Sequence, residues 1–347
     1  MIIYMAGIFA FIFTLIATPI VIKGAYRYGF IAEPRKDRWS QKPTALLGGI
    51  AIFISFLIVV LLFNRDWNPL HIGIIVGAVI IFIVGLKDDI KPLRPKMKFW
   101  LQMIVAVATV AVGLKIETNL GFMIDSIISI VWIVGIMNAV NLIDNIDGLS
   151  SGIAFIASIT AAIFLFIAGN PFFSIVTLSL AGAALAFLLF NFKPAKIFMG
   201  DCGSLMLGYI LGTSTIAIQG TLGLSSGMMN AFYIPALILA VPIFDTFFVA
   251  VERKRHGRAI SQGGKDHTSH RLVYITGSDV KSVVILYVLG AFFGSISLIG
   301  YFNPGIIQYI SIGLAMMLGV LLAIILVKYA PVYENKEEKM AGAVSLD

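Results

Sequence analysis

The sequence has few charged residues and a single cysteine. Asp, Glu, Lys and Arg make up only 12% of its 347 residues, whereas 59% are hydrophobic and the mean hydropathy is +0.98. This composition excludes an ordinary soluble domain. The lone Cys202 excludes an intramolecular disulfide. The sequence also shows no internal repeat and no low-complexity linker, so we expect one domain over residues 1–330.

Long apolar runs are abundant instead, and they predict an all-α polytopic integral membrane protein. A bilayer span needs roughly 20 apolar residues, and several runs are somewhat shorter. About eleven transmembrane helices are predicted, over residues 2–22, 47–63, 72–86, 99–114, 122–141, 150–168, 172–192, 204–219, 230–250, 281–301 and 305–328. Residues 331–347 are charged at first and predict a disordered tail.

The basic residues predict the orientation of these helices. With the N-terminus outside, all but two of the 25 lysines and arginines fall on one side, and only Arg65 and Lys115 fall on the other. The richer side is cytoplasmic by the positive-inside rule, which also places the C-terminus there. A basic rim beside anionic lipid explains the net charge of +7 without any nucleic acid.

Residues 138–152 carry the densest polar cluster, at the end of an apolar run. If the helix continues, Asn138 and Asn141 share a stripe with Asp144 or Asn145, because they are spaced by three and four. Carboxylate and amide oxygens are hard ligands that suit Mg²⁺. The alternative is a plain helix end followed by an Asp/Asn-rich turn that Gly148 closes.

Two further acidic positions follow the same pattern. Asp88 and Asp89 come directly after an apolar run, and adjacent carboxylates repel unless a cation or proton donor lies near them. A solvated helix end is the alternative. Asp201 lies between Gly200 and Gly203 just before the next helix, with Phe198 upstream. It is either a simple N-cap or a site that reaches a metal–diphosphate, with Phe198 stacking on a base.

The remaining candidates are a carboxylate, a basic loop and two histidines. Asp245 lies inside an apolar run, which makes it a functional candidate by default, with snorkelling toward Arg253 or Arg255 as the alternative. Lys42 ends a basic stretch that is either an ordinary cytoplasmic flank or a collar for phosphates. His267 and His270 lie near Lys265 and Arg271, and these cations favour phosphate binding over a zinc site.

Five motifs in this order resemble one family: K-D-D, N-A-V-N-L-I-D-N-I-D-G, F-M-G-D-C-G-S-L, P-I-F-D-T and H-T-S-H-R-L. They are similar to the polyprenyl-phosphate N-acetylhexosamine-1-phosphate transferases, which include undecaprenyl-phosphate GlcNAc-1-phosphate transferases and phospho-MurNAc-pentapeptide transferases. The resemblance extends to about residue 328. It implies an enzyme that moves a sugar-1-phosphate from a UDP-sugar to undecaprenyl phosphate and releases UMP.

The resemblance also implies roles for single residues. Asp201 matches the family's magnesium-binding aspartate, and Asn141 matches a residue that joins it. Asp88, with Asp89 beside it, matches the aspartate that receives or deprotonates the lipid phosphate. Catalytic roles are therefore predicted for Asp88, Asp89, Asp144 and His267, metal binding for Asp201 and Asn141, and substrate binding for Asn138, Asp147, Phe198, Lys42, Asp245, His270 and Arg271.

Some positions depart from the family's pattern. Ala45 and Leu46 replace the Pro and Arg that the GlcNAc branch often carries, and Ser269 stands where many members have another histidine. A triple-histidine mechanism is therefore not expected. The H-R-L ending and the eleventh apolar segment favour the GlcNAc branch, with the MurNAc-pentapeptide branch as the alternative.

The predicted setting is the inner membrane of a bacterium, with the site on the cytoplasmic face. The expected partners are undecaprenyl phosphate, a UDP-N-acetylhexosamine and the lipid bilayer, and a homodimer is a further expectation. The expected cofactor is Mg²⁺, with Mn²⁺ as an alternative. A cation-coupled transporter would instead place ionisable groups near the bilayer midplane and show repeat symmetry. A non-catalytic membrane scaffold would need no clustering of carboxylates.

Overall fold

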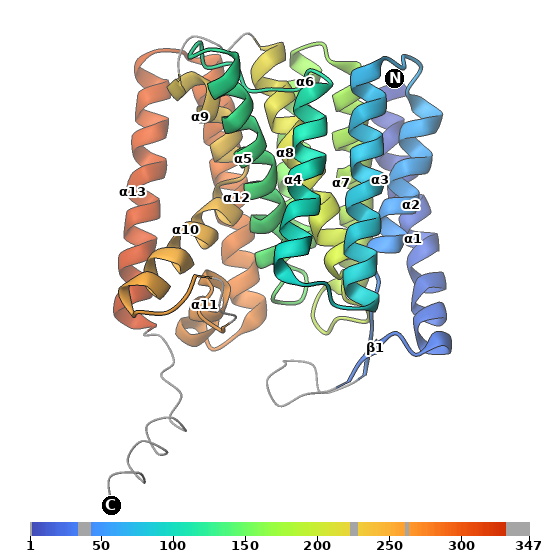
Figure 1. Ribbon diagram of the computed structural model, residues 1–347. Coiled ribbons are helices and arrows are strands. Elements are labelled where there is room, and N and C mark those ends of the chain that lie inside the picture. The colour runs from blue at the N-terminus through green and yellow to red at the C-terminus, as the bar shows by residue number, and fades with distance from the viewer. Residues whose placement is uncertain (1, 34–42, 223–227, 261–263, 331–347) are drawn as a thin grey trace, which may run out of the picture.

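The protein is a bundle of long helices that run roughly side by side in the computed structural model (Figure 1). The structure describes residues 2–33, 43–222, 228–260 and 264–330. Lys42 and the predicted tail 331–347 lie outside these residues. The helices are α1 (Ile2–Tyr28), α2 (Gly49–Phe63), α3 (Pro69–Ile90), α4 (Pro95–Ala111), α5 (Phe122–Leu142), α6 (Leu149–Ile167), α7 (Pro171–Asn191), α8 (Asp201–Thr221), α9 (Met228–Ile238), α10 (Ala240–Arg255), α11 (Thr268–Thr276), α12 (Asp279–Phe302) and α13 (Ile306–Tyr329).

Ten of the eleven predicted apolar segments each fall on one helix, and the segment 230–250 falls on two, α9 and α10. Eight described helices are long and apolar enough to cross a membrane, and a ninth span results if α9 and α10 count as one. The composition and these helices make the chain an all-helical, multi-pass membrane protein. In the described chain the only strands are β1 (Ile31–Ala32) and β2 (Thr44–Ala45), which pair antiparallel.

Local sequence signals set several helix starts. Pro69, Pro95 and Pro171 each begin a helix, where the missing N–H costs nothing. The Asn68 side chain accepts the His71 N–H at the start of α3, and Asn170 does the same for α7.

The ninth predicted segment, 230–250, is broken rather than continuous. Helices α9 and α10 meet at Leu239 with a bend of 87°. Pro242 in the first turn of α10 has no N–H to donate to the Ile238 carbonyl, and its ring would collide with that carbonyl in a continuous helix. Leu239 accordingly leaves the helical conformation (φ −106°, ψ 22°).

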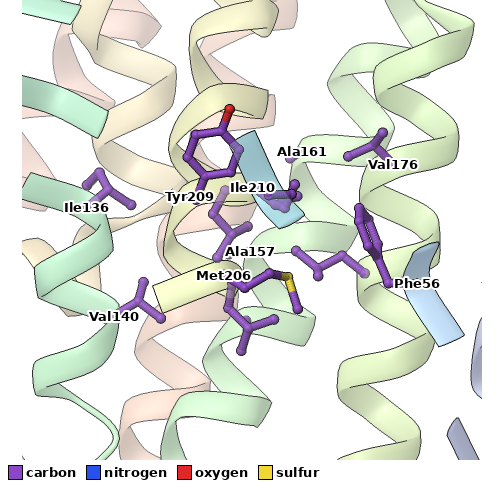
Figure 2. Close-up of a cluster of buried hydrophobic side chains, with 14 of the residues drawn as sticks. Phe56, Ile136, Val140, Ala157, Ala161, Val176, Met206, Tyr209 and Ile210 are labelled. Atoms are coloured by element: carbon purple, nitrogen blue, oxygen red, sulfur yellow. The ribbon is translucent and has the colours of Figure 1, made fainter. Parts of the chain in front are cut away.

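Helix α8 is the centre of the bundle, and its apolar side chains are almost completely buried. Figure 2 shows Met206, Tyr209 and Ile210 of α8 between Ile136 of α5 on one side and Phe56 of α2 on the other. Since α8 is enclosed along its length, its first residue, Asp201, is held at a fixed place at the end of the bundle.

Glycines allow two close helix contacts. A Cβ on Gly182 of α7 would clash with the Gly7 carbonyl oxygen of α1. A Cβ on Gly85 of α3 would lie 2.5 Å from the Asp201 carbonyl oxygen and 2.6 Å from Cys202 Cα. Small residues at such positions let backbones approach in a membrane. The second contact brings the end of α3 directly against the start of α8.

Candidate active site

A cavity of about 380 Å³ opens at the lower end of the bundle as drawn in Figure 1, where α3, α5, α7 and α8 begin or end. Six of the predicted site residues line it: Asp89, Asp144, Asp147, Phe198, Asp201 and His270. These residues come from four separate parts of the sequence. The fold therefore gathers at one place most of the polar motifs that the sequence singles out.

Asp89 holds the start of α8. Its Oδ1 accepts the Asp201 backbone N–H at 2.8 Å, and its Oδ2 accepts the Cys202 N–H at 3.0 Å. The first N–H groups of a helix lack intrahelical partners and carry partial positive charge, so a carboxylate there is stabilised. Asp89 thus acts on Asp201 by fixing its backbone.

The Asp88 carboxylate accepts hydrogen bonds from different donors than the Asp89 carboxylate does. It accepts the Leu93 N–H at 2.6 Å and the Lys98 ammonium at 3.2 Å. Lys98 also pairs with Asp201, so one cation of α4 joins the two carboxylates. The sequence interpretation counted Lys98 only among the basic flanking residues and missed this role. The local sequence carries no signal for this role, because only the turn between α3 and α4 brings Lys98 next to Asp88.

Asn141 reaches Asp201, as the resemblance implies, whereas Asn138 does not. The Asn141 amide donates to Asp201 Oδ1 at 2.9 Å and to Ser204 Oγ at 2.8 Å. Asn138 instead donates to Gln102 Oε1 and to the Val134 carbonyl, and it does not line the cavity. Its predicted substrate contact therefore stays a prediction without support from this geometry.

The α5–α6 loop places two acidic side chains at the cavity. Burial raises the pKa of Asp147, which accepts the Ala195 N–H at 3.1 Å. Burial, together with the nearby carboxylates of Asp201, Asp89 and Asp147, raises the pKa of Asp144 to about 8. Several negative groups thus crowd one small space, and a cation in it would be strongly favoured.

Asn191 and Tyr287 fix this loop, and neither was among the predicted site residues. Asn191 Oδ1 accepts the Gly148 N–H at 3.1 Å, while its amide donates to the Ile197 carbonyl at 2.9 Å. The Tyr287 hydroxyl donates to the Gly148 carbonyl at 2.6 Å. Gly148 adopts φ +81°, a conformation that glycine tolerates best. Nothing in the local sequence of α7 or α12 marks these two residues as supports of the loop.

Phe198 is positioned through its backbone. Its N–H donates to the Ala45 carbonyl at 2.8 Å, and its carbonyl accepts the Gly48 N–H at 2.9 Å. The ring is left half-buried at the cavity wall. Leu46 lines the same cavity, so the departure from the family's Arg at this position lies within the site. The segment 43–48 therefore belongs to the site, although Lys42 lies outside the described residues.

The two histidines of the H-T-S-H-R-L motif have different surroundings. His267 Nδ1 lies 2.8 Å from Asp245 Oδ2, and Asp245 Oδ1 accepts the Thr268 N–H at 2.7 Å. Asp245 therefore contacts neither Arg253 nor Arg255, the snorkelling partners considered from sequence. His270 lines the cavity, and burial together with the nearby His267 lowers its pKa to about 4. Its imidazole is neutral at pH 7.

Three predicted substrate-binding residues lie away from the cavity wall. Asp245 is engaged with His267 as described, and Asn138 with Gln102. Arg271 is 4% exposed and donates to protein groups of α10 and α13. Asp279, which the sequence interpretation did not select, does line the cavity and pairs with Lys193.

Comparison with known proteins gives consistent matches. Residues 71–219 match the family described as glycosyl transferase family 4. A probable undecaprenyl-phosphate N-acetylglucosaminyl 1-phosphate transferase of Bacillus subtilis is 36% identical over 302 residues, covering 84% of this chain and 83% of the relative. The chain belongs to this glycosyl transferase family. The resemblance predicted from the five motifs is confirmed.

Other relatives of this glycosyl transferase represent both branches. A decaprenyl-phosphate N-acetylglucosaminephosphotransferase of Mycolicibacterium smegmatis is 29% identical, covering 93% of this chain and 86% of the relative. A phospho-N-acetylmuramoyl-pentapeptide-transferase of Staphylococcus carnosus is 30% identical, covering 85% of this chain and 98% of the relative.

The donor set of this glycosyl transferase fits Mg²⁺. Among the described residues, no three His, Cys, Asp or Glu side chains form a ready-made metal cage. Mg²⁺ rarely needs one, because it is bound by one or two carboxylates and takes its other ligands from water and substrate phosphates. Asp201 and Asp144 supply carboxylate oxygens at one cavity, and Asn141 supplies an amide next to Asp201. The raised pKa of Asp144 marks uncompensated negative charge at this place.

The raised pKa of Asp144 gives this glycosyl transferase an expected pH dependence. The folded protein keeps a proton on Asp144 up to about pH 8, whereas an unfolded aspartate loses it near 3.8. Unfolding between these values releases a proton, so the free energy of unfolding decreases as pH rises through this range. Without divalent cations, we expect the midpoint of thermal unfolding to fall from about pH 5 to about pH 8. Differential scanning fluorimetry at several pH values measures this.

Two comparisons make this test specific. The Asp144→Asn variant should make the dependence less steep, since its amide does not titrate, whereas Asp201, whose pKa burial raises to about 6, keeps its contribution. Addition of Mg²⁺ should raise the unfolding midpoint most at the alkaline end, where the carboxylate is ionised. An equally steep dependence in wild type and Asp144→Asn would assign the effect to another group.

Proposed function

We propose that this protein transfers GlcNAc-1-phosphate from UDP-GlcNAc to undecaprenyl phosphate and releases UMP, as the first membrane step in the synthesis of a cell-wall polymer or surface polysaccharide. The observation that carries the proposal is the acidic cavity at the end of the bundle, with Asp201 joined to Lys98, Asn141 and Asp89. The relatives of both branches are named for transfer of a sugar phosphate to a polyprenyl phosphate or for a related cell-wall step.

The proposed arrangement has eleven membrane crossings, with the N-terminus outside and the cavity on the cytoplasmic face of a bacterial inner membrane. The eleven apolar segments of the sequence are the basis of this count. Eight described helices are long and apolar enough to cross a membrane, and α9 with α10 would make a ninth. The distribution of lysine and arginine supports the orientation. The position of the carboxylates at helix ends, away from the middle of the bundle, speaks against a cation-coupled transporter.

The proposed chemistry needs little proton transfer. The second pKa of a phosphate monoester is about 6, so the lipid phosphate is largely dianionic at neutral pH. One of its oxygens attacks the phosphorus that carries the sugar, and the bond from that phosphorus to the UMP oxygen breaks. In this proposal Lys98, held by Asp88, positions the lipid phosphate, and the neutral His270 donates a hydrogen bond to the diphosphate.

The main obstacle is the repulsion between the lipid phosphate and the diphosphate. Bound at Asp201, Asn141 and Asp144, Mg²⁺ would supply positive charge that screens this repulsion and stabilises the leaving UMP. Lys98 contributes a second positive charge at the same carboxylate. Phe198, half-buried on the cavity wall, offers a ring face to the uracil.

UMP release by the purified protein with undecaprenyl phosphate tests the proposal. UDP-GlcNAc and UDP-MurNAc-pentapeptide are compared, each with and without Mg²⁺. Turnover of UDP-GlcNAc that requires Mg²⁺ would support the proposed branch. Turnover with the pentapeptide substrate alone would move the protein to the peptidoglycan branch, and no turnover with either by folded protein would refute the proposed substrates.

Truncation of Phe198 should weaken nucleotide binding. Base–aromatic stacking contributes about 1–3 kcal/mol, so the Phe198→Ala variant should raise the KM for UDP-GlcNAc roughly tenfold or more. The KM for undecaprenyl phosphate should change little, because the ring is assigned to the base alone. Steady-state kinetics with each substrate varied in turn measures both values. Phe99→Ala removes an exposed ring of α4 as the control, and an equal effect there would contradict the assignment.

A further inference from the structure

Arg271 lies where three helices meet at the lower end of the bundle. It belongs to α11 and follows His270 directly, yet its side chain points away from the cavity wall. Its Nη2 donates to Glu252 Oε2 of α10 at 3.0 Å. Its Nη1 donates to the Ala330 carbonyl at 3.0 Å and to the Leu326 carbonyl at 3.5 Å, both at the end of α13. Its Nε donates to the Asp266 carbonyl at 3.2 Å.

The Glu252 carboxylate and the terminal carbonyls of α13 are both stabilised by a cation at this place. Glu252 is 3% exposed, and a buried carboxylate is costly unless it is paired. The last carbonyls of a helix have no intrahelical partner and carry partial negative charge, which a guanidinium neutralises. The Arg271 guanidinium also lies 4.9 Å from the ring centroid of Phe248. With its donors on all three sides engaged, Arg271 is not oriented to bind a substrate phosphate.

Helix α13 has few other attachments. Within this helix only Ser311 and Leu326 are buried, and most of its side chains face outward. The Arg271 contacts lie at its last turn, next to Leu326. The hydrogen bonds that Arg271 donates to the Leu326 and Ala330 carbonyls therefore connect the lower end of α13 to α11.

The same short helix carries the histidine that lines the cavity. α11 has nine residues, begins next to His267 and ends at Gly277 in the left-handed conformation. A shift of Arg271 must therefore move His270, one residue away. A displacement of about 1 Å at a reacting group can lower a rate about 10²-fold.

We propose that Arg271 is a positioning residue: by joining Glu252 of α10 to the terminal carbonyls of α13, it holds α11 and its His270 against the cavity. The same hydrogen bonds hold the last turn of α13 against α11. The effect on turnover rests on the proposed sugar-phosphate transfer, whereas the effect on α11 itself does not.

The test compares Arg271→Gln, Glu252→Gln and the double variant Glu252→Gln/Arg271→Gln. Arg255→Gln is the matched control, because Arg255 contacts the other oxygen of Glu252 at 3.2 Å, is exposed, and does not reach α13. Hydrogen–deuterium exchange is measured for residues 268–276 and for the last turn of α13 in the full-length protein. Initial rates of UMP release are measured at a temperature where every variant is folded.

Arg271→Gln should increase exchange in α11 and at the end of α13 and should lower kcat at least tenfold, with a smaller change in KM. The double variant should recover part of both losses. Arg271→Gln alone leaves the buried Glu252 carboxylate with only the exposed Arg255 as its cation, whereas Glu252→Gln removes that charge. Arg255→Gln should match wild type in both measurements. If Arg271→Gln does not fold, Arg271→Lys replaces it, since lysine keeps the charge but cannot reach three partners at once.

Other results would overturn the proposal. Unchanged exchange in α11, combined with a tenfold higher KM for the UDP-sugar, would make Arg271 a substrate contact. A double variant no better than Arg271→Gln would exclude the pairing with Glu252 as the cause. Failure of the wild type to release UMP would count against the proposed function alone, because the exchange measurements would still decide the role of Arg271.

Discussion

Asp201→Asn is expected to lower kcat/KM for UMP release about 10²–10³-fold, the loss typical when a group that stabilises transition-state charge is removed. Asp201 is the point where Lys98 and Asn141 meet, and it starts the enclosed helix α8. Asparagine keeps the shape of the side chain but removes its charge, which weakens both the Lys98 pair and the proposed Mg²⁺ site. The measurement is the rate of UMP release over a range of Mg²⁺ concentrations.

Asp88→Asn should cost less than Asp201→Asn, about tenfold, because we expect Asp88 to position the lipid phosphate rather than to remove a proton from it. Asp66→Asn, at an exposed aspartate between α2 and α3, is the control and should leave the rate unchanged. Equal losses in Asp88→Asn and Asp201→Asn, with a matching shift of the pH–rate profile, would instead indicate obligatory base catalysis by Asp88.

Gly85→Ala is expected to lower both stability and activity although Gly85 touches no substrate. The added Cβ would lie 2.5 Å from the Asp201 carbonyl oxygen and 2.6 Å from Cys202 Cα. Backbone atoms cannot rotate away as a side chain can, so α3 and α8 must separate, at a cost of about 1–3 kcal/mol. This separation lengthens the two hydrogen bonds from the start of α8 to Asp89, and we expect the rate to fall at least tenfold.

The control for Gly85→Ala is Gly135→Ala in α5. Gly135 is also inside a helix, but a Cβ there has no neighbouring atom within 4 Å. Alanine at this position should be neutral or should stabilise the helix by up to about 1 kcal/mol. Thermal unfolding and UMP release are measured for both variants. Wild-type values for Gly85→Ala would mean that the two helices can separate without moving Asp201.

The sequence predicted the long helices well because each of them contains an apolar run, and such a run is a local property. The nine-residue helix α11 is not apolar and was not predicted. The broken segment 230–250 shows the limit of this signal. Pro235 and Pro242 both lie within it, but proline is tolerated in membrane helices when neighbours satisfy the freed backbone groups. Hydropathy alone therefore could not distinguish one helix from two that meet at 87°.

The candidate site was predictable where a motif stood close to a helix end, and not where two distant segments meet. The pair Asp88 and Asp89 illustrates both cases. Their adjacency predicted that donors must lie nearby, but only the fold shows that Asp89 receives the N–H groups of α8 and Asp88 receives Lys98. Asn191 and Asp279 were missed for the same reason, since their neighbours at the cavity come from other helices.

The close contact between Gly7 of α1 and Gly182 of α7 has a consequence for biosynthesis. Helix α1 packs against a helix that is made six helices later. Until the ribosome has produced α7, this surface of α1 faces lipid or transient neighbours. The final packing of the N-terminal half therefore waits for the middle of the chain, and any truncation before α7 leaves α1 without its main partner.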